Sequence, residues 1–270
     1  MIHLDDGVPA VRTAGQLHYS YFPGSEGGSE PLVLLNSLGT SVEIWAPLLP
    51  GLTAATSVVC IDYPGHGWSS TINAPRELDA LALQISGVLD TLQIERAHLA
   101  GVSIGGMLAL RLAALRATRI RSIAVMGSAP TMDRALWTGR GELVKKSGTA
   151  AIVGELMPRW FTAAFRDANP AIIERYVGLL SQTDDAAYAA LCTALAGIDI
   201  RPGLMKVRCP TLIVVGTEDP GATIDDAAEI ATGIPQADIE IVEGAAHQLQ
   251  AMAPTRITEL VLEQLRRVAA

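Results

Sequence analysis

The pentapeptide Gly101-Val102-Ser103-Ile104-Gly105 decides the fold, because it lies where an apolar stretch ends and a helical pattern begins. Residues 97–100 form a short apolar run typical of a buried strand, and apolar residues recur at helical spacing over residues 106–117. The pattern predicts a sharp strand-turn-helix with Ser103 on the turn, the arrangement of a nucleophile elbow. We expect glycine on both sides of the serine to be required, since a side chain would clash with neighbouring backbone there.

Length and composition bound the class of protein. A chain of 270 residues can bury one sizeable core with room for an insertion. No apolar run approaches the roughly 20 residues that span a bilayer, and residues 1–6 lack the basic start and apolar stretch of a signal peptide. These features predict a cytoplasmic protein without a membrane partner. The net charge of −8 argues against nucleic acid as a partner, because phosphate binding needs a basic surface.

The chain has three cysteines, Cys60, Cys192 and Cys209, and their pattern indicates neither disulfide bonds nor a metal site. Their number is odd and no C-x-x-C spacing occurs, so we expect neither a disulfide framework nor a metal site. Cys60 and Cys209 are interpreted as packing residues associated with strands.

Strands alternate with helices at intervals typical of βαβ units, which predicts an α/β fold with a mostly parallel central sheet flanked by helices. Most expected strands are continuously apolar, as happens where helices cover both faces of a sheet, whereas residues 17–21 alternate like a half-exposed strand. The expected strands cover residues 17–21, 31–35, 57–61, 97–100, 120–126, 211–215 and 239–242. The expected helices cover about residues 77–92, 104–117, 225–232 and 254–268.

Between residues 129 and 206 the strand signal disappears and the sequence becomes helical. We interpret this segment as a helical cap inserted between two parts of a core, residues 1–128 and 207–270. From residue 131 to 210 there are ten Lys and Arg against eight Asp and Glu, whereas the rest of the chain has ten against twenty. A basic lid on an acidic body could draw an anionic substrate toward a cleft. Solvated helix faces explain most of the ten equally well.

If the cap receives an anion, at least one of its arginines should face the cleft near Trp137 or Trp160. The candidates are Arg134, Arg140, Arg159 and Arg166.

A serine nucleophile needs a base, and five histidines are available. His247 follows the last expected strand, on a loop that can fold over the strand ends and reach the serine. His66 belongs to a Pro-Gly-His-Gly turn, where bracing the loop is the better interpretation. The others lie in the N-terminal segment (His3) or within expected strands (His18 and His98).

The acid should come from a loop between the serine and the histidine, following the chain order that goes with such an elbow. Asp219 is the first candidate, because the strand over residues 211–215 ends in Gly216 and Pro220 halts local structure just after the carboxylate. There it could accept a hydrogen bond from one nitrogen of His247 and fix the imidazole tautomer. Glu218 is the alternative acid.

The oxyanion hole is the remaining part. The Asn36-Ser37-Leu38-Gly39 loop follows a buried strand, and the backbone N–H of Leu38 can point into the cleft beside that of Ile104.

Together these residues make the chain similar to the α/β-hydrolase superfamily over nearly its whole length, and more specifically to the 3-oxoadipate enol-lactonases. The segments more specific to the enol-lactonases are the Asn-Ser-Leu-Gly loop and the Arg-Trp-Phe-Thr segment of the cap. Trp137 also lies where that family tends to carry a cap tryptophan. The resemblance is carried by residues 34–40 with Trp45, 65–69, 101–107, 159–162 with 165–166, and 216–220.

Three positions depart from the pattern of that family. Pro64 stands where an arginine is usual, Ile104 stands where methionine is common, and residues 248–252 differ from the usual run after the histidine. A different acyl or lactone substrate could account for them.

The resemblance implies an α/β-hydrolase fold with an inserted cap, no cofactor, and ring opening of an anionic enol-lactone in bacterial aromatic catabolism. Ser103 would form an acyl-enzyme, with Asp219 and His247 completing the triad. Two other enzymes fit the same triad, a carbon–carbon bond hydrolase acting on a diketone and a general carboxylesterase. The alternative that is not an enzyme is a binding protein with the same fold and no catalytic activity.

Overall fold

The computed structural model describes residues 12–14, 17–25, 30–71 and 74–269. Within them an eight-stranded sheet has the order β1-β2-β4-β3-β5-β6-β7-β8. β2 pairs antiparallel with β1 and β4, and all other neighbours are parallel, which confirms the expected mostly parallel sheet. The strands are β1 (Arg12–Ala14), β2 (Leu17–Phe22), β3 (Leu32–Leu35), β4 (Val58–Ile61), β5 (Ala97–Val102), β6 (Ile120–Met126), β7 (Thr211–Gly216) and β8 (Ala237–Val242).

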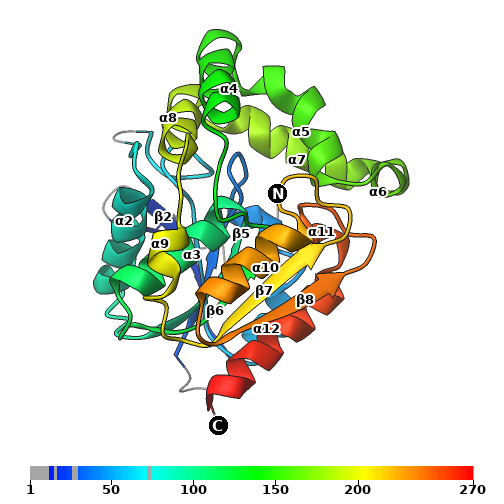
Figure 1. The fold of residues 1–270 in the computed structure, drawn as a ribbon. Helices are drawn as coiled ribbons and strands as arrows, with labels where there is room; N and C mark the ends of the chain where they lie inside the picture. Colours follow the sequence, from blue (N-terminus) through cyan, green and yellow to red (C-terminus); the bar gives the residue numbers. More distant parts are fainter. Residues whose placement is uncertain (1–11, 15–16, 26–29, 72–73, 270) are drawn as a thin grey trace.

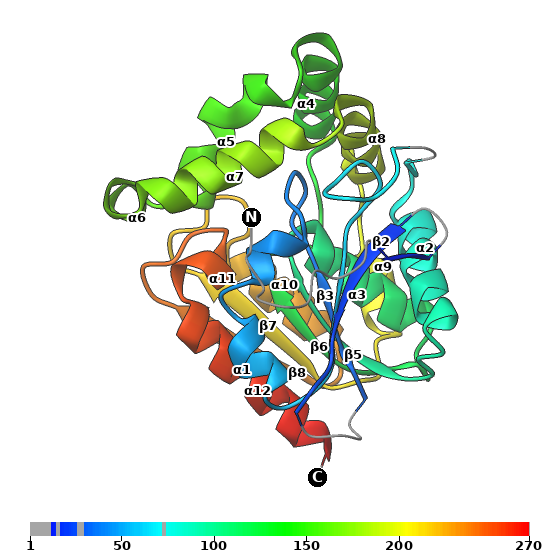
Figure 2. The same ribbon diagram turned by 180° about the vertical axis from the view of Figure 1, so that it is seen from behind.

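Helices cover both faces of the sheet (Figures 1 and 2). α1 and α12 pack on one face, and α2, α3 and α10 cover the other, with α9 beside α3 and α10. Because helices cover both faces, β3, β4 and β5 are buried along their whole length, and their sequences are almost entirely apolar. The bounds are η1 (Val42–Trp45), α1 (Leu49–Thr53), α2 (Leu78–Thr91), α3 (Ile104–Leu115), α9 (Arg201–Leu204), α10 (Ile224–Gly233), α11 (Leu249–Met252) and α12 (Pro254–Ala269).

A helical insertion between β6 and β7 lies over one end of the sheet (Figure 1), as the sequence predicts. We call α4 to α8 the cap; its exact limits at residues 129 and 206 stay a prediction. Where the chain enters and leaves the cap, the two connecting segments pair through an antiparallel bridge between Thr131 and Asp199. The cap consists of α4 (Arg134–Ser147), η2 (Thr149–Ile152), α5 (Val153–Trp160), α6 (Ala163–Ala168), α7 (Pro170–Gln182) and α8 (Asp185–Leu195).

The expectation of a half-exposed strand at residues 17–21 is wrong. The first four of these residues are buried, because β1 pairs outside β2 and the loop after β4 covers His18. β1 has three residues, and η1, α1, α9 and α11 have four or five. Elements this short show no period in the sequence, which is why the sequence did not predict them.

The cysteines pack as expected. Cys60 lies in β4 and Cys209 just before β7, and with Cys192 they are buried free thiols. Among the described residues, no helix is long and apolar enough to cross a membrane. His3 lies outside the described residues.

His98 on β5 is a buried histidine away from the serine end of the sheet. Its Nδ1 lies 2.7 Å from the hydroxyl oxygen of Ser122 on β6. Burial lowers the pKa of His98 from 6.5 to about 4. The folded protein therefore resists a proton that the unfolded chain accepts below pH 6.5.

This depressed pKa should make the fold sensitive to acid. The contribution of His98 to the free energy of unfolding is fully present above its pKa in the unfolded chain. It is lost as the pH falls toward its pKa in the folded protein, because in that range only the unfolded chain gains the proton. We expect His98→Gln, which cannot titrate, to lose about 2 kcal/mol less free energy of unfolding than wild type between pH 7 and pH 5. Urea unfolding at both pH values measures this, and equal losses in the two proteins would contradict it.

Candidate active site

Ser103 lies on a strained turn between β5 and α3. Its φ of 60° and ψ of −121° are rare for a residue with a side chain. A Cβ added at Gly101 would lie 2.3 Å from the carbonyl carbon of Gly105, and one added at Gly105 would lie 2.2 Å from the carbonyl oxygen of Leu35. Such distances leave no space for a side chain, so the expected requirement for glycine on both sides is confirmed.

Two hydrogen bonds from β6 and the residues after it hold this turn. The N–H of Ser103 donates to the carbonyl oxygen of Met126 (2.8 Å), and the Ser128 hydroxyl donates to the carbonyl oxygen of Ser103 (2.7 Å). Strain of this kind costs about 1–3 kcal/mol and persists only where the surroundings over-determine it. The turn is thus fixed from the side of β6, with the serine side chain at the cavity.

His247 and Asp219 form a hydrogen-bonded pair beyond the carboxyl ends of β7 and β8. Nδ1 of His247 lies 2.8 Å from Oδ2 of Asp219, whose side chain is 1% exposed. The other carboxylate oxygen, Oδ1, accepts the N–H groups of Gly221 (2.8 Å) and Ala222 (3.1 Å). As the acceptor of a hydrogen bond from Nδ1–H, the Asp219 carboxylate favours the tautomer of His247 in which Nε2 keeps a free lone pair. Glu218, the alternative acid, is exposed.

Gly127 makes room for this pair. Its φ is +53°, and a Cβ built on it would lie 3.2 Å from Oδ2 of Asp219 and 3.4 Å from Nδ1 of His247. A larger residue here would press on the imidazole–carboxylate hydrogen bond.

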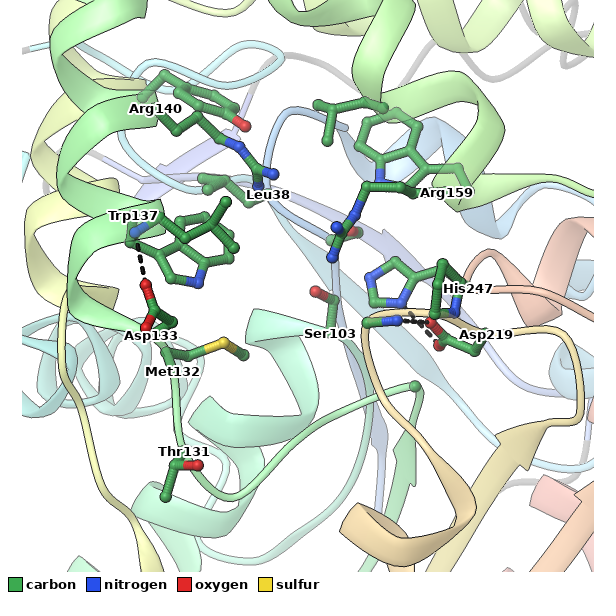
Figure 3. Close-up of a pocket in the computed structure, with 18 residues that line it drawn as sticks. Leu38, Ser103, Thr131, Met132, Asp133, Trp137, Arg140, Arg159, Asp219 and His247 are labelled. Atoms are coloured by element: carbon green, nitrogen blue, oxygen red, sulfur yellow. Dashed lines mark hydrogen bonds and ion pairs between the residues drawn. The ribbon is translucent and has the colours of Figure 1, made fainter.

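Ser103, His247 and Asp219 line one cavity of about 320 Å³ between the cap and the strand ends. This volume lies at the lower end of the range for small-molecule sites. Figure 3 shows Arg159 reaching from the cap toward Ser103, with Trp137 and Arg140 on the opposite wall. The other lining residues are Ser37, Leu38, Gly127, Thr131, Met132, Asp133, Leu136, Leu156, Trp160, Tyr188, Pro220 and Gly221.

The loop after β3 brings Leu38 to this cavity. As the first residue of α3, Ile104 has an N–H that no carbonyl within the helix can accept. These are the two backbone donors expected for an oxyanion hole, and both follow directly from strands that end beside each other, β3 and β5.

Buried side chains from the loop after β4 fix the loop that carries Leu38. His66 braces it as expected: its Nδ1 lies 2.9 Å from the carbonyl oxygen of Pro64, and its Nε2 accepts the N–H of Gly39 at 3.0 Å. Only the neutral Nδ1–H tautomer makes both bonds. Burial lowers the pKa of His66 below its usual value, which keeps this tautomer in place near pH 7.

Asp62 anchors the same loop and was not identified from the sequence. Its fully buried carboxylate accepts the N–H of Val42 (2.8 Å) and lies 2.7 Å from Nδ1 of His18. Asn36 adds a third tie, since its amide donates to the carbonyl oxygen of Ile61 (2.9 Å) and accepts from Nε1 of Trp45 (2.7 Å). The loop is therefore held at several points by neighbouring segments.

Of the four candidate arginines of the cap, the structure brings Arg140 and Arg159 to the cavity. Arg140 is buried, forms an ion pair with Glu155, and lies 4.7 Å from the ring centroid of Trp137. None of the ion pairs among the described residues involves Arg159. Its half-buried guanidinium is therefore a cation without an ion-pair partner.

Arg134 and Arg166 lie outside the lining of this cavity. The guanidinium of Arg134 lies against Gly197, and Arg166 is in α6. Both expected tryptophans, Trp137 and Trp160, do line it. Tyr188 is a lining residue that the sequence did not reveal, because its position depends on how α8 packs against α4.

No three His, Cys, Asp or Glu side chains in the described part of the chain are grouped so as to hold a metal ion.

Comparison with known proteins identifies the class. Residues 32–260 match the model of the alpha/beta hydrolase family, so the chain belongs to this family. It is a hydrolase with a helical insertion over the end of its sheet.

Within the family the chain resembles enol-lactonases. The 3-oxoadipate enol-lactonase 2 of Acinetobacter baylyi is 31% identical over 268 residues, 99% of this chain and 98% of the relative. The 3-oxoadipate enol-lactonase 1 of the same organism is 34% identical over 232 residues, 85% of this chain and 86% of the relative. The crystal structure of the enol-lactonase from Burkholderia xenovorans LB400 superposes with a TM-score of 0.89 at 31% identity, over 93% of this chain and 96% of that chain.

The hydrogen bond between His247 and Asp219 predicts which carboxylate matters for catalysis. Asp219→Asn should keep the geometry but favour the wrong imidazole tautomer, lowering kcat by about 10⁴-fold as in serine triads. Glu218→Gln is the matched control one residue away, and its exposed side chain should leave kcat unchanged. Steady-state kinetics on an aryl ester compares the two variants. A larger loss in Glu218→Gln would show that the acid is misassigned.

Proposed function

We propose that the protein is a serine hydrolase that opens a small, carboxylate-bearing enol-lactone such as 3-oxoadipate enol-lactone. The observation that carries this proposal is one small cavity lined by Ser103, by the His247–Asp219 pair and by the unpaired guanidinium of Arg159. The likeness to enol-lactonases over nearly the whole chain supports the substrate class.

The mechanism follows from these groups. Nε2 of His247 takes the proton of the Ser103 hydroxyl as its oxygen attacks the lactone carbonyl carbon. The N–H groups of Leu38 and Ile104 hold the oxyanion of the tetrahedral intermediate. The carbonyl re-forms as the ring C–O bond breaks, and the proton on Nε2 of His247 passes to the departing enolate oxygen. This leaves an acyl-enzyme on Ser103 and a neutral imidazole. Water activated by His247 then releases the acid, and the serine regains its proton.

An enol-lactone suits this site because its leaving group is an enolate. Delocalisation of the negative charge makes expulsion easier than that of a simple alkoxide. The leaving group stays attached to the acyl chain after ring opening, so the cavity must hold the whole opened molecule until water attacks. A cavity of about 320 Å³ suits a substrate of this size.

Arg159 gives the substrate carboxylate a partner. A half-buried cation without an ion-pair partner gains from a charge-assisted hydrogen bond to a carboxylate. Arg140 is less available, since Glu155 already neutralises it. The aromatic faces of Trp137 and Trp160 would enclose the ring of the lactone.

The proposed function is tested by replacing the nucleophile. Ser103→Ala should abolish turnover while leaving the melting temperature within a few degrees of wild type, because the hydroxyl lines the cavity rather than the packed core. Kinetics with an enol-lactone, a neutral aryl ester and a vinylogous diketone, with Ser103→Ala as the blank, measures this. Burst kinetics in the variant would refute the assignment, and preference for the diketone would favour a carbon–carbon bond hydrolase.

The carboxylate contact predicts a charge-selective loss. Arg159→Gln should remove about 1.5–3 kcal/mol of transition-state stabilisation for a carboxylate-bearing lactone. That loss lowers kcat/KM roughly 10- to 150-fold. A neutral ester of similar size should be nearly unaffected. Arg134→Gln, which removes a cap arginine outside the cavity, is the control. Equal losses for both substrates would mean that the change disturbs the cap instead of removing a charge contact.

A further inference from the structure

The residues directly after His247 join the core to the cap. The N–H of Gln248 donates to the carbonyl oxygen of Trp160 at the end of α5 (3.1 Å). Nε2 of Gln250 donates to the hydroxyl oxygen of Tyr176 on α7 (3.0 Å) and to Oε1 of Gln248 (2.7 Å). Gln248 and Gln250 are completely buried and Tyr176 is 3% exposed. We call Gln248, Gln250 and Tyr176 the cap latch.

The aromatic side chains of the cap extend the latch to the cavity wall. The ring of Tyr176 packs edge-on against Trp160, with centroids 6.0 Å apart, and against Phe161, with centroids 4.9 Å apart. Trp160 is thus held twice, by its carbonyl at Gln248 and by its ring at Tyr176. Both ties lead back to the segment that begins at His247.

The cap latch links two residues of the cavity, His247 and Arg159, through few bonds. His247 is bonded covalently to Gln248, and Arg159 is bonded covalently to Trp160. One backbone hydrogen bond, from Gln248 to Trp160, closes the gap between these two dipeptides. A shift of α5 against the core would therefore change the distance between the imidazole and the guanidinium.

We propose that the cap latch positions Arg159 and Trp160 relative to His247, and so sets the preference of the site for substrates that carry a carboxylate. The inference rests on the proposed function in one respect, the role of Arg159 as the partner of the carboxylate. Hydrogen bonds suit such a role because they fix distance and direction, whereas apolar contacts would hold the cap with less defined geometry. Polar groups buried this deeply are costly unless paired. Nε2 of Gln250 pairs across the joint with the Tyr176 hydroxyl, whereas Nε2 of Gln248 and Oε1 of Gln250 have no hydrogen-bond partner.

The test compares two esters that share a leaving group. Phenyl acetate has an acyl group too short to reach the cap wall, and monophenyl glutarate carries a carboxylate at the far end of its acyl chain. Selectivity is the kcat/KM for the glutarate ester divided by that for the acetate. Tyr176→Phe, which removes only the hydroxyl, should lower selectivity about 2- to 10-fold, the range for one neutral hydrogen bond. The change should appear in KM for the glutarate ester, with kcat for phenyl acetate unchanged.

Gln250→Leu removes the same hydrogen bond from the core side. It also removes the bond from Gln250 to Gln248, so it should lower selectivity at least as far as Tyr176→Phe. Adding Tyr176→Phe to Gln250→Leu should cause little further loss, because the bond to the hydroxyl is then already absent. Glu43→Gln is the matched control: it weakens the exposed ion pair between Glu43 and Arg175, the neighbour of Tyr176 on α7, and should leave selectivity at the wild-type value.

The melting temperature separates positioning from stability. A lowered melting temperature with wild-type selectivity in Tyr176→Phe and Gln250→Leu would overturn the proposal, and so would fully additive losses or an equal loss in Glu43→Gln. If wild type hydrolyses the glutarate ester but opens no enol-lactone, the proposed substrate fails. The selectivity of the latch variants would still decide this inference, because it is measured on esters.

Discussion

The close backbone approach around Ser103 is the constraint on which the site depends. β3, β5 and the start of α3 come so near to one another that Gly101 and Gly105 leave no space for a Cβ. The serine itself takes a rare conformation that β6 holds through the carbonyl oxygen of Met126. Packing of the sheet supplies the free energy that offsets this strain, and in return the nucleophile has one orientation.

The same approach decides where the other groups lie. Because Gly105 lies against the carbonyl oxygen of Leu35, the loop after β3 must leave the sheet beside the serine, and Leu38 comes to the cavity as a consequence. β6 ends beside Ser103, and Gly127 directly after it leaves the space in which Asp219 and His247 meet. Each strand end thus contributes one part of the site, and the order of strands in the sheet sets their spacing.

The sequence predicted those parts that are local or ordered along the chain. The elbow and α3 follow from a period and two glycines, and the pairing of Asp219 with His247 follows from chain order. Asp62 escaped prediction because its partners, Val42 and His18, are distant in sequence and meet only when β4 pairs with β2 and β3. The role of each cap arginine escaped for a similar reason, since it depends on the rotation of a helix.

The basic residues of the cap act on a substrate over shorter distances than the charge composition of the cap suggests. The net charge of −8 is spread over the surface, where charges more than about 8 Å apart are largely screened at physiological ionic strength. Of the two cap arginines that line the cavity, Arg140 is paired with Glu155, which leaves Arg159 as the one without an ion pair. Such a cation acts over the length of a hydrogen bond. Its main effect should therefore be to orient a carboxylate against Ser103, with little influence on the rate of encounter, so the position of α5 above the sheet matters more than the total charge of the cap.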